Sequence, residues 1–212
     1  MTSTHTPQQV PPAWAIALLV FGGGAIGMML ELTGARVLAP YFGNSLFIWT
    51  SLIGVMLGFM SLGYFLGGRL ADSRLDAGNL FWILAGAALS VSMVNFVEGA
   101  FLPWITTNGA TRLLAVPATL LGMVSPYCIR LRMHALEDSG ATVGTLYAIS
   151  TVGSIVGTFA AGFWLLAVFG THDLLVVLAT GLAGLSLLVL GGIADWRRLV
   201  VLGLLVILLV LG

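Results

Sequence analysis

The chain has 212 residues, of which 59% are hydrophobic and only 8% are charged, and its mean hydropathy is +1.08. Soluble domains carry roughly 25% charged residues, so this composition excludes a water-soluble fold. The formal net charge is zero, and every basic residue is an arginine that stands alone or in a pair. That pattern excludes a basic surface for nucleic acid.

Apolar runs of about 20 residues, each long enough to cross a bilayer, divide the chain. We expect an all-α integral membrane protein with a cytoplasmic tail (1–12), a six-helix domain (13–191), and a loop with an incomplete seventh helix (192–212). Breaker residues predict helices at 13–38, 46–67, 80–97, 113–131, 143–169 and 174–191. The last apolar run, 199–212, reaches only about 21 Å as a helix, which is too short for a full span.

Arginines indicate the orientation. The connections after the second, fourth and sixth helices carry Arg69 and Arg74, Arg130 and Arg132, and Arg197 and Arg198, and the other side has only Arg36 and Arg112. The positive-inside rule then places those three connections and the N-terminus in the cytoplasm. We expect a multi-pass protein of the bacterial inner membrane whose first partner is the lipid bilayer.

Glu31 is a carboxylate inside an apolar span, and such a group hints at proton coupling or cation binding. If its helix begins at Ala13, Glu31 lies about 27 Å along it, where hydration or pairing is the alternative. Arg36 is five residues away, about 140° round the helix, so a salt bridge needs a partner from another helix. Both interpretations stay open.

Small residues predict close helix packing. In the first helix Gly23, Gly27 and Gly34 share one stripe, in the second Gly54 and Gly58 share a face with Ser51 and Ser61, and in the fifth Gly153 and Gly157 form G-x-x-x-G.

Polar residues follow one face of the fifth helix: Tyr147, Thr151, Ser154 and Thr158 fall within about 60° on a helical wheel. Such a stripe lines a water-filled path or a substrate cavity, or else its hydroxyls bond to carbonyls four residues back in the same helix. The sequence does not choose between them.

Pro117 and Pro126 lie within the fourth helix, where each removes a backbone donor, so we expect a kink or a break. Breaks of this kind occur at transporter binding sites and also as plain kinks. A second candidate segment is the charged turn after the second helix, with Gly68, Arg69, Asp72 and Arg74, which is either a conformational latch or a solvated loop.

No cofactor or metal is expected. Gly22, Gly24 and Gly27 match G-x-G-x-x-G, but no strand precedes them, and a phosphate site in lipid would be costly. The three histidines are dispersed, and the sequence shows no nucleophile with a base and an orienting group. The sequence therefore predicts no catalytic residues.

Three stretches resemble the membrane-embedded N-terminal region of fused major-facilitator-like/spermidine synthase proteins, the polyamine aminopropyltransferases with membrane helices. They are ELTGARVLAPYFGNSLFIWTSLIGVMLGFMSLGYFLGGRLAD from Glu31, ATLLGMVSPYCIRL from Ala118, and VGTLYAISTVGSIVGTFAAGFWL from Val143. GGRLADSR is also similar to the G-x-L-A-D loop motif of major facilitators, without its downstream glycine and basic pair. GSIVGTFAAG is similar to their fifth-helix motif, with Thr158 where proline is common.

The resemblance implies a six-helix unit like half of a major facilitator. In relatives, it implies, a cytosolic aminopropyltransferase domain follows, using decarboxylated S-adenosylmethionine and a polyamine. The glycine-rich cofactor loop and catalytic aspartate of that domain have no counterpart in this chain, so no catalytic residue is carried over.

Three hypotheses follow. The first is a membrane domain of a spermidine-synthase-like protein that lacks the catalytic domain and anchors or serves an aminopropyltransferase domain or subunit. The second is a small facilitator-like transporter or half-transporter that dimerises to move a small solute, such as a cationic polyamine. The third is a structural subunit of a membrane complex, packed through its glycine faces.

Overall fold

The computed structural model describes residues 11–43, 45–101, 108–135 and 139–189. Within them every element is helical, and six helices are long and apolar enough to cross a membrane. The helical prediction is therefore confirmed, and the six spans fit a multi-pass membrane protein. The seventh apolar run, with Arg197 and Arg198, and most of the tail lie outside the described residues.

The elements follow in the order α1 (Ala13–Phe42), α2 (Leu46–Ser73), α3 (Ala77–Phe101), α4 (Asn108–Ala135), α5 (Ser139–Ala160), η2 (Ala161–Leu165), α6 (Leu166–Val168) and α7 (Gly170–Val189). Helices are the expected solution in lipid, because each residue can satisfy its backbone groups within its own segment. The element η2 is a single stretch of π-helix between α5 and α6.

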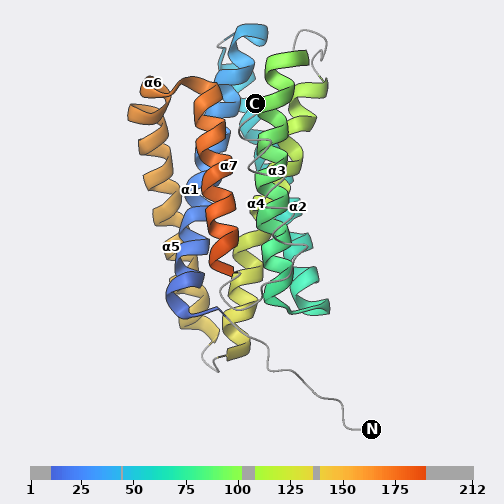
Figure 1. Cartoon of the computed structure of the whole chain (residues 1–212), viewed down its shortest axis with the longest axis vertical. Coiled ribbons are helices and arrows are strands. Elements are labelled where there is room, and N and C mark those ends of the chain that lie inside the picture. The colour runs from blue at the N-terminus through green and yellow to red at the C-terminus, as the bar shows by residue number, and fades with distance from the viewer. Residues whose placement is uncertain (1–10, 44, 102–107, 136–138, 190–212) are drawn as a thin grey trace.

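Consecutive long helices run antiparallel (Figure 1), so the helix termini gather at two ends of the bundle. The α2–α3 turn and the end of α4 lie at the same end as the start of α1. The end of α1, the start of α2 and α6 lie at the other end. We call the first the Arg-rich end, because it carries Arg69, Arg74, Arg130 and Arg132.

The helices are longer than the sequence predicted. The first extends four residues further, to Phe42, and the chain turns at Gly43, whose φ of 77° favours glycine. The second continues through Ser73 rather than ending at Gly67. A second positive φ, 73° at Gly170, separates α6 from α7. The first prediction ends too early because α1 continues through Pro40, and the second because the charged last turns of α2 are too polar for a hydropathy pattern.

Helices α3 and α4 form the centre of the bundle, and α2 and α5 lie at its margin. About two thirds of the most apolar window of α3 and of α4 is buried, against 22% for α2 and for α5. The closest packing joins α2 to α4 and α1 to α5, and α7 covers α3 and α1. In a soluble protein such bare helices would be unstable, but lipid can cover them.

Candidate functional site

Helices α2 and α4 approach until their backbones touch near the Arg-rich end. A Cβ atom on Gly63 would overlap the carbonyl of Thr119, and one on Gly67 would lie 2.7 Å from Met123 Cα. On the facing helix, Gly122 meets the backbone of Met60 and Gly63. Three glycines that the sequence did not single out therefore set this spacing.

That close approach brings polar groups of α2 and α4 together one to two turns further along. Arg130 Nε donates to Asp72 Oδ1 at 3.0 Å, with both side chains exposed (47% and 69%). Because water screens the pair, it contributes little to the free energy of unfolding. The ion pair matters because it fixes the positions of the Asp72 and Arg130 side chains on the surface.

Tyr127 makes the stronger connection. Its ring is fully buried, and its hydroxyl oxygen lies 2.9 Å from the Arg74 carbonyl, 2.8 Å from the Asp76 carbonyl and 3.0 Å from the Asp76 N–H, from which it accepts. Asn79 Nδ2 donates to the same Arg74 carbonyl at 2.9 Å. One α4 side chain therefore holds the turn between α2 and α3, and the turn in return satisfies a hydroxyl on a buried ring.

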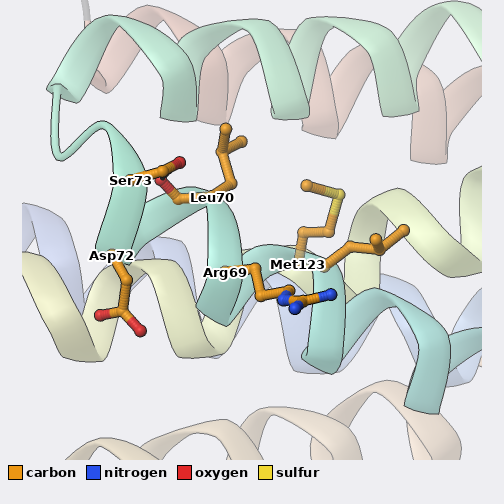
Figure 2. Close-up of a pocket in the computed structure, with 6 residues that line it drawn as sticks. Arg69, Leu70, Asp72, Ser73 and Met123 are labelled. Carbon is orange, nitrogen blue, oxygen red and sulfur yellow. Dashed lines mark hydrogen bonds between the residues drawn. The ribbon is translucent and has the colours of Figure 1, made fainter.

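Two hollows flank Asp72. The first is an open groove of about 770 Å³, lined by Leu66, Arg69, Leu70, Asp72, Ser73 and Met123. Figure 2 shows the Arg69 side chain reaching toward Met123, while Asp72 points away from it. The Arg69 guanidinium also lies 4.9 Å from the centre of the Phe65 ring.

The second hollow, of about 180 Å³, lies between α2, α4 and α5. It is lined by Gly68, Asp72, Pro126, Ile129, Arg130, Met133, Val143 and Tyr147. Apolar walls with a few convergent polar groups are the usual composition of a binding pocket. We call the two hollows, the Asp72–Arg130 pair and the Tyr127 hydrogen bonds the Arg-end cluster.

The sequence placed Gly68, Arg69, Asp72 and Arg74 in a loop, and this is wrong for the first three. They lie in the last turns of α2, and only Arg74 follows the helix. The sequence missed Tyr127 and Arg130 as their partners. A signal was present, because the two residues are three apart on α4 and so share one helix face.

Glu31 and Arg36 do not come together. Glu31 is buried, with 9% of its surface exposed, and Arg36 is exposed. Among the described residues no hydrogen bond or ion pair joins either side chain to a partner. The helix continues for about 16 Å beyond Glu31, so the carboxyl lies deeper in the bundle than a helix ending at Leu38 would place it.

The Thr151, Ser154 and Thr158 hydroxyls of the fifth-helix stripe are satisfied within their own helix. Thr151 donates to the Tyr147 carbonyl at 2.9 Å, Ser154 to Ser150 at 3.1 Å, and Thr158 to Ser154 at 2.8 Å. Of the two interpretations left open, the structure therefore has the bonds to carbonyls four residues back. Such hydroxyls can face lipid at little cost, so the stripe by itself is no evidence for a water path.

The predicted glycine contacts differ among the helices. Gly153 and Gly157 lie against the backbone carbonyls of Phe21 and Ala25, so α5 does touch α1 there. The partner glycine on α1 is Gly24, a residue outside the predicted stripe, and its missing side chain makes room for Ser150.

The stripe itself meets side chains of α4 and α2. Gly23 faces Val124, Gly34 faces Leu114, and Gly27 faces the end of Met60. On α2, Gly54 and Gly58 have no atom within 4 Å of an added Cβ and their face is exposed, so this face meets no other helix of the described chain. Spacing marks a small-residue face but does not say which neighbour it meets.

The fourth helix does not break. It runs from Asn108 to Ala135 through both Pro117 and Pro126. Each proline still leaves the carbonyl four residues earlier without its usual donor. Pro126 lines the smaller hollow of the Arg-end cluster.

In the described part of the chain, no three histidine, cysteine, aspartate or glutamate side chains gather to hold a metal ion. Comparison of the sequence and structure with protein-family models, curated proteins and solved structures gave no match.

Proposed function

We propose that this chain is the membrane-embedded unit of a spermidine-synthase-like protein, and that its Arg-rich end holds an aminopropyltransferase domain or subunit. The observation that carries the proposal is the Arg-end cluster, in which an exposed ion pair lies beside two hollows. The resemblance of three stretches of sequence supplies the partner's class.

The cluster has the composition of a small docking surface. The groove offers apolar side chains, Leu66, Leu70 and Met123, with Arg69 beside them. Protein interfaces commonly combine an apolar pocket for an anchoring side chain with charged groups around it. Tyr127 fixes the turn next to the groove, so little conformational freedom is lost when a partner binds.

The arginine distribution supports a cytosolic location for this surface. Arg69, Arg74, Arg130 and Arg132 belong to the end where α1 begins, and the positive-inside rule assigns such an end to the cytoplasm. Decarboxylated S-adenosylmethionine and polyamines are cytosolic substrates in this proposal. The six alternating helices suit a facilitator-like half in a bacterial inner membrane with the N-terminus inside.

Co-purified activity tests the proposal. The tagged full chain is extracted from its host membranes in mild detergent and assayed for transfer of an aminopropyl group from decarboxylated S-adenosylmethionine to putrescine. We expect activity with the wild-type chain and at least a tenfold loss with Arg69→Glu, because the charge reversal opposes the partner. Asp173→Arg, a reversal at the opposite end, is the matched control and should retain activity. Absence of transferase activity with the wild-type chain contradicts the proposal.

A second function, a half-transporter that works as a dimer, is favoured by a different observation. The least buried helices, α2 and α5, flank α4 at the smaller hollow, so one side of the bundle is open along α2, α4 and α5. A second copy laid against that side would enclose a path. Uptake of labelled spermidine into liposomes, reduced by Glu31→Gln, is the expected result, and reconstituted protein that neither binds nor transports polyamines contradicts it.

A further inference from the structure

Glu31 of α1, Pro117 of α4 and the π-helical stretch that follows α5 lie at one level along the bundle axis. The residues that meet between these helices show this register. On α1 and α4, which are antiparallel, Gly23 meets Val124 and Gly34 meets Leu114. Glu31 is three residues before Gly34, and three residues after Leu114 is Pro117. The buried carboxyl and the first proline of α4 are therefore at the same height.

The register between α1 and α5 adds the third feature. These helices are parallel, because Phe21 meets Gly153 and Ala25 meets Gly157. Continued by six residues, the same register brings Glu31 level with Phe163, within the π-helical stretch Ala161–Leu165. Helix α1 packs against η2. Single π-helical turns occur often at functional sites, because they loosen the regular backbone bonding.

The direction of the Glu31 side chain follows from the helix period. Two turns earlier on nearly the same line, about 20° away, Gly24 faces Ser150 and Ser154 of α5. One turn earlier, about 40° away, Gly27 faces Met60 of α2. Glu31 therefore points between α5 on one side and α2 with α4 on the other, and only 9% of it is exposed.

The charged side chains that the structure describes around this position are remote or exposed. On α1 the nearest is the exposed Arg36, about 140° round the helix, and on α2 the first are Arg69 and Asp72 at the Arg-rich end. Helix α5 has no charged residue between Gly140 and Ala160, and α7 contributes the exposed His172 and Asp173. Helix α4 has Arg112 near its start, whose side chain lies outside the description, and Arg130 and Arg132 at the far end.

We propose that Glu31 is a proton-binding site in the interior of the bundle, occupied at neutral pH while α1, α2, α4 and α5 are packed as described. A buried carboxylate is unstable in apolar surroundings, and among the described side chains no cation lies beside Glu31. A proton taken from water converts it into a neutral acid with one O–H donor. Pro117 has no N–H for the Leu113 carbonyl, so an acceptor without its usual donor lies within about one helical turn of the level of that acid.

Infrared difference spectroscopy of the full chain in lipid nanodiscs tests the proposal. A protonated carboxylic acid has a C=O stretching band that is separate from the carboxylate bands and shifts in heavy water. We expect this band at pH 7 in the wild-type chain and its loss in Glu31→Gln. Asp72→Asn, which removes an exposed carboxylate, is the control and should keep the band. If Glu31→Gln does not fold, Glu31→Asp should keep a protonated band at a shifted frequency.

Three results would overturn the assignment. The first is the absence of a protonated band at pH 7 in the wild-type chain. The second is a band that persists unchanged in Glu31→Gln, because another carboxyl would then carry it. The third is a band that disappears when sodium ions are added at constant pH, because the site would then take a metal cation in preference to a proton.

Discussion

Particular polar groups at the two ends of the bundle differ in whether they have partners. At the Arg-rich end, the Tyr127 hydroxyl has three backbone partners and Asp72 has Arg130. Toward the other end, Glu31 has no partner among the described residues, and the buried Asn95 Oδ1 accepts no hydrogen bond there. Satisfied groups hold helices in place, whereas unsatisfied ones cost stability. The difference points to structure at one end and to ligand or proton binding at the other.

The largest expected effect comes from separating α2 and α4. Gly63→Leu should leave little folded protein, with a cost of about 3 kcal/mol or more, because a side chain there would overlap the Thr119 backbone. The fraction of monodisperse protein in size-exclusion chromatography and its melting temperature measure this. Gly58→Leu, on the exposed face of the same helix, should behave like the wild type. Equal damage from both variants would show that the α2–α4 contact is not what orders the Arg-rich end.

Next in size is the loss of the Tyr127 hydroxyl. Tyr127→Phe should lower the free energy of unfolding by about 1–3 kcal/mol, because the hydroxyl's backbone partners in the α2–α3 turn lose their bond. Denaturation in mixed micelles of increasing sodium dodecyl sulfate measures this. The matched control is Tyr147→Phe, since the Tyr147 side chain is exposed. A Tyr127→Phe chain as stable as the control would mean that the α2–α3 turn does not depend on the Tyr127 hydroxyl.

Asn95→Leu tests the end of the bundle away from the Arg-rich end. It should raise the free energy of unfolding rather than lower it. Asn95 is 4% exposed and its Oδ1 lacks a donor among the described residues, so an apolar side chain of similar size should raise stability by about 1 kcal/mol. The same denaturation curve applies. Ser92→Ala is the control, because the Ser92 hydroxyl is already bonded to the Ala88 carbonyl. A destabilised Asn95→Leu chain would indicate that Asn95 has a partner, and the contrast between the two ends would weaken.

The smallest effect is expected for the exposed ion pair. A double-mutant cycle with Asp72→Ala and Arg130→Ala should give a coupling energy under about 1 kcal/mol, reduced further in high salt. Both variants should still weaken binding of an aminopropyltransferase partner if the Arg-end cluster is its docking surface. A coupling energy well above that value would indicate that Asp72 and Arg130 stabilise the fold and do not serve mainly as a docking surface.

Local sequence patterns were sufficient to predict the helices but not to predict which helices pack against each other. Each apolar run is long enough to span a bilayer, and a span must be helical because its backbone bonds have no other partners. The same patterns ended α2 at Gly67 and chose Gly54 and Gly58 as packing residues. Gly63 and Gly67 are the residues that meet α4. In lipid both faces of α2 are apolar, so no hydrophobic pattern distinguishes the packed face from the lipid face.

The sequence by itself determined that the described chain is helical, with six spans that fit a multi-pass membrane protein, and that Glu31 is an unusual residue within one of them. Only the tertiary structure decided what lies around these residues. Tyr127 meets a turn about fifty positions earlier in the chain, and Glu31 shares its level with Pro117 of α4 and the π-helical turn after α5. Such contacts and shared levels depend on the axial register between helices. Register is set by side-chain volume and glycine contacts summed along whole helices, which no short stretch of sequence contains.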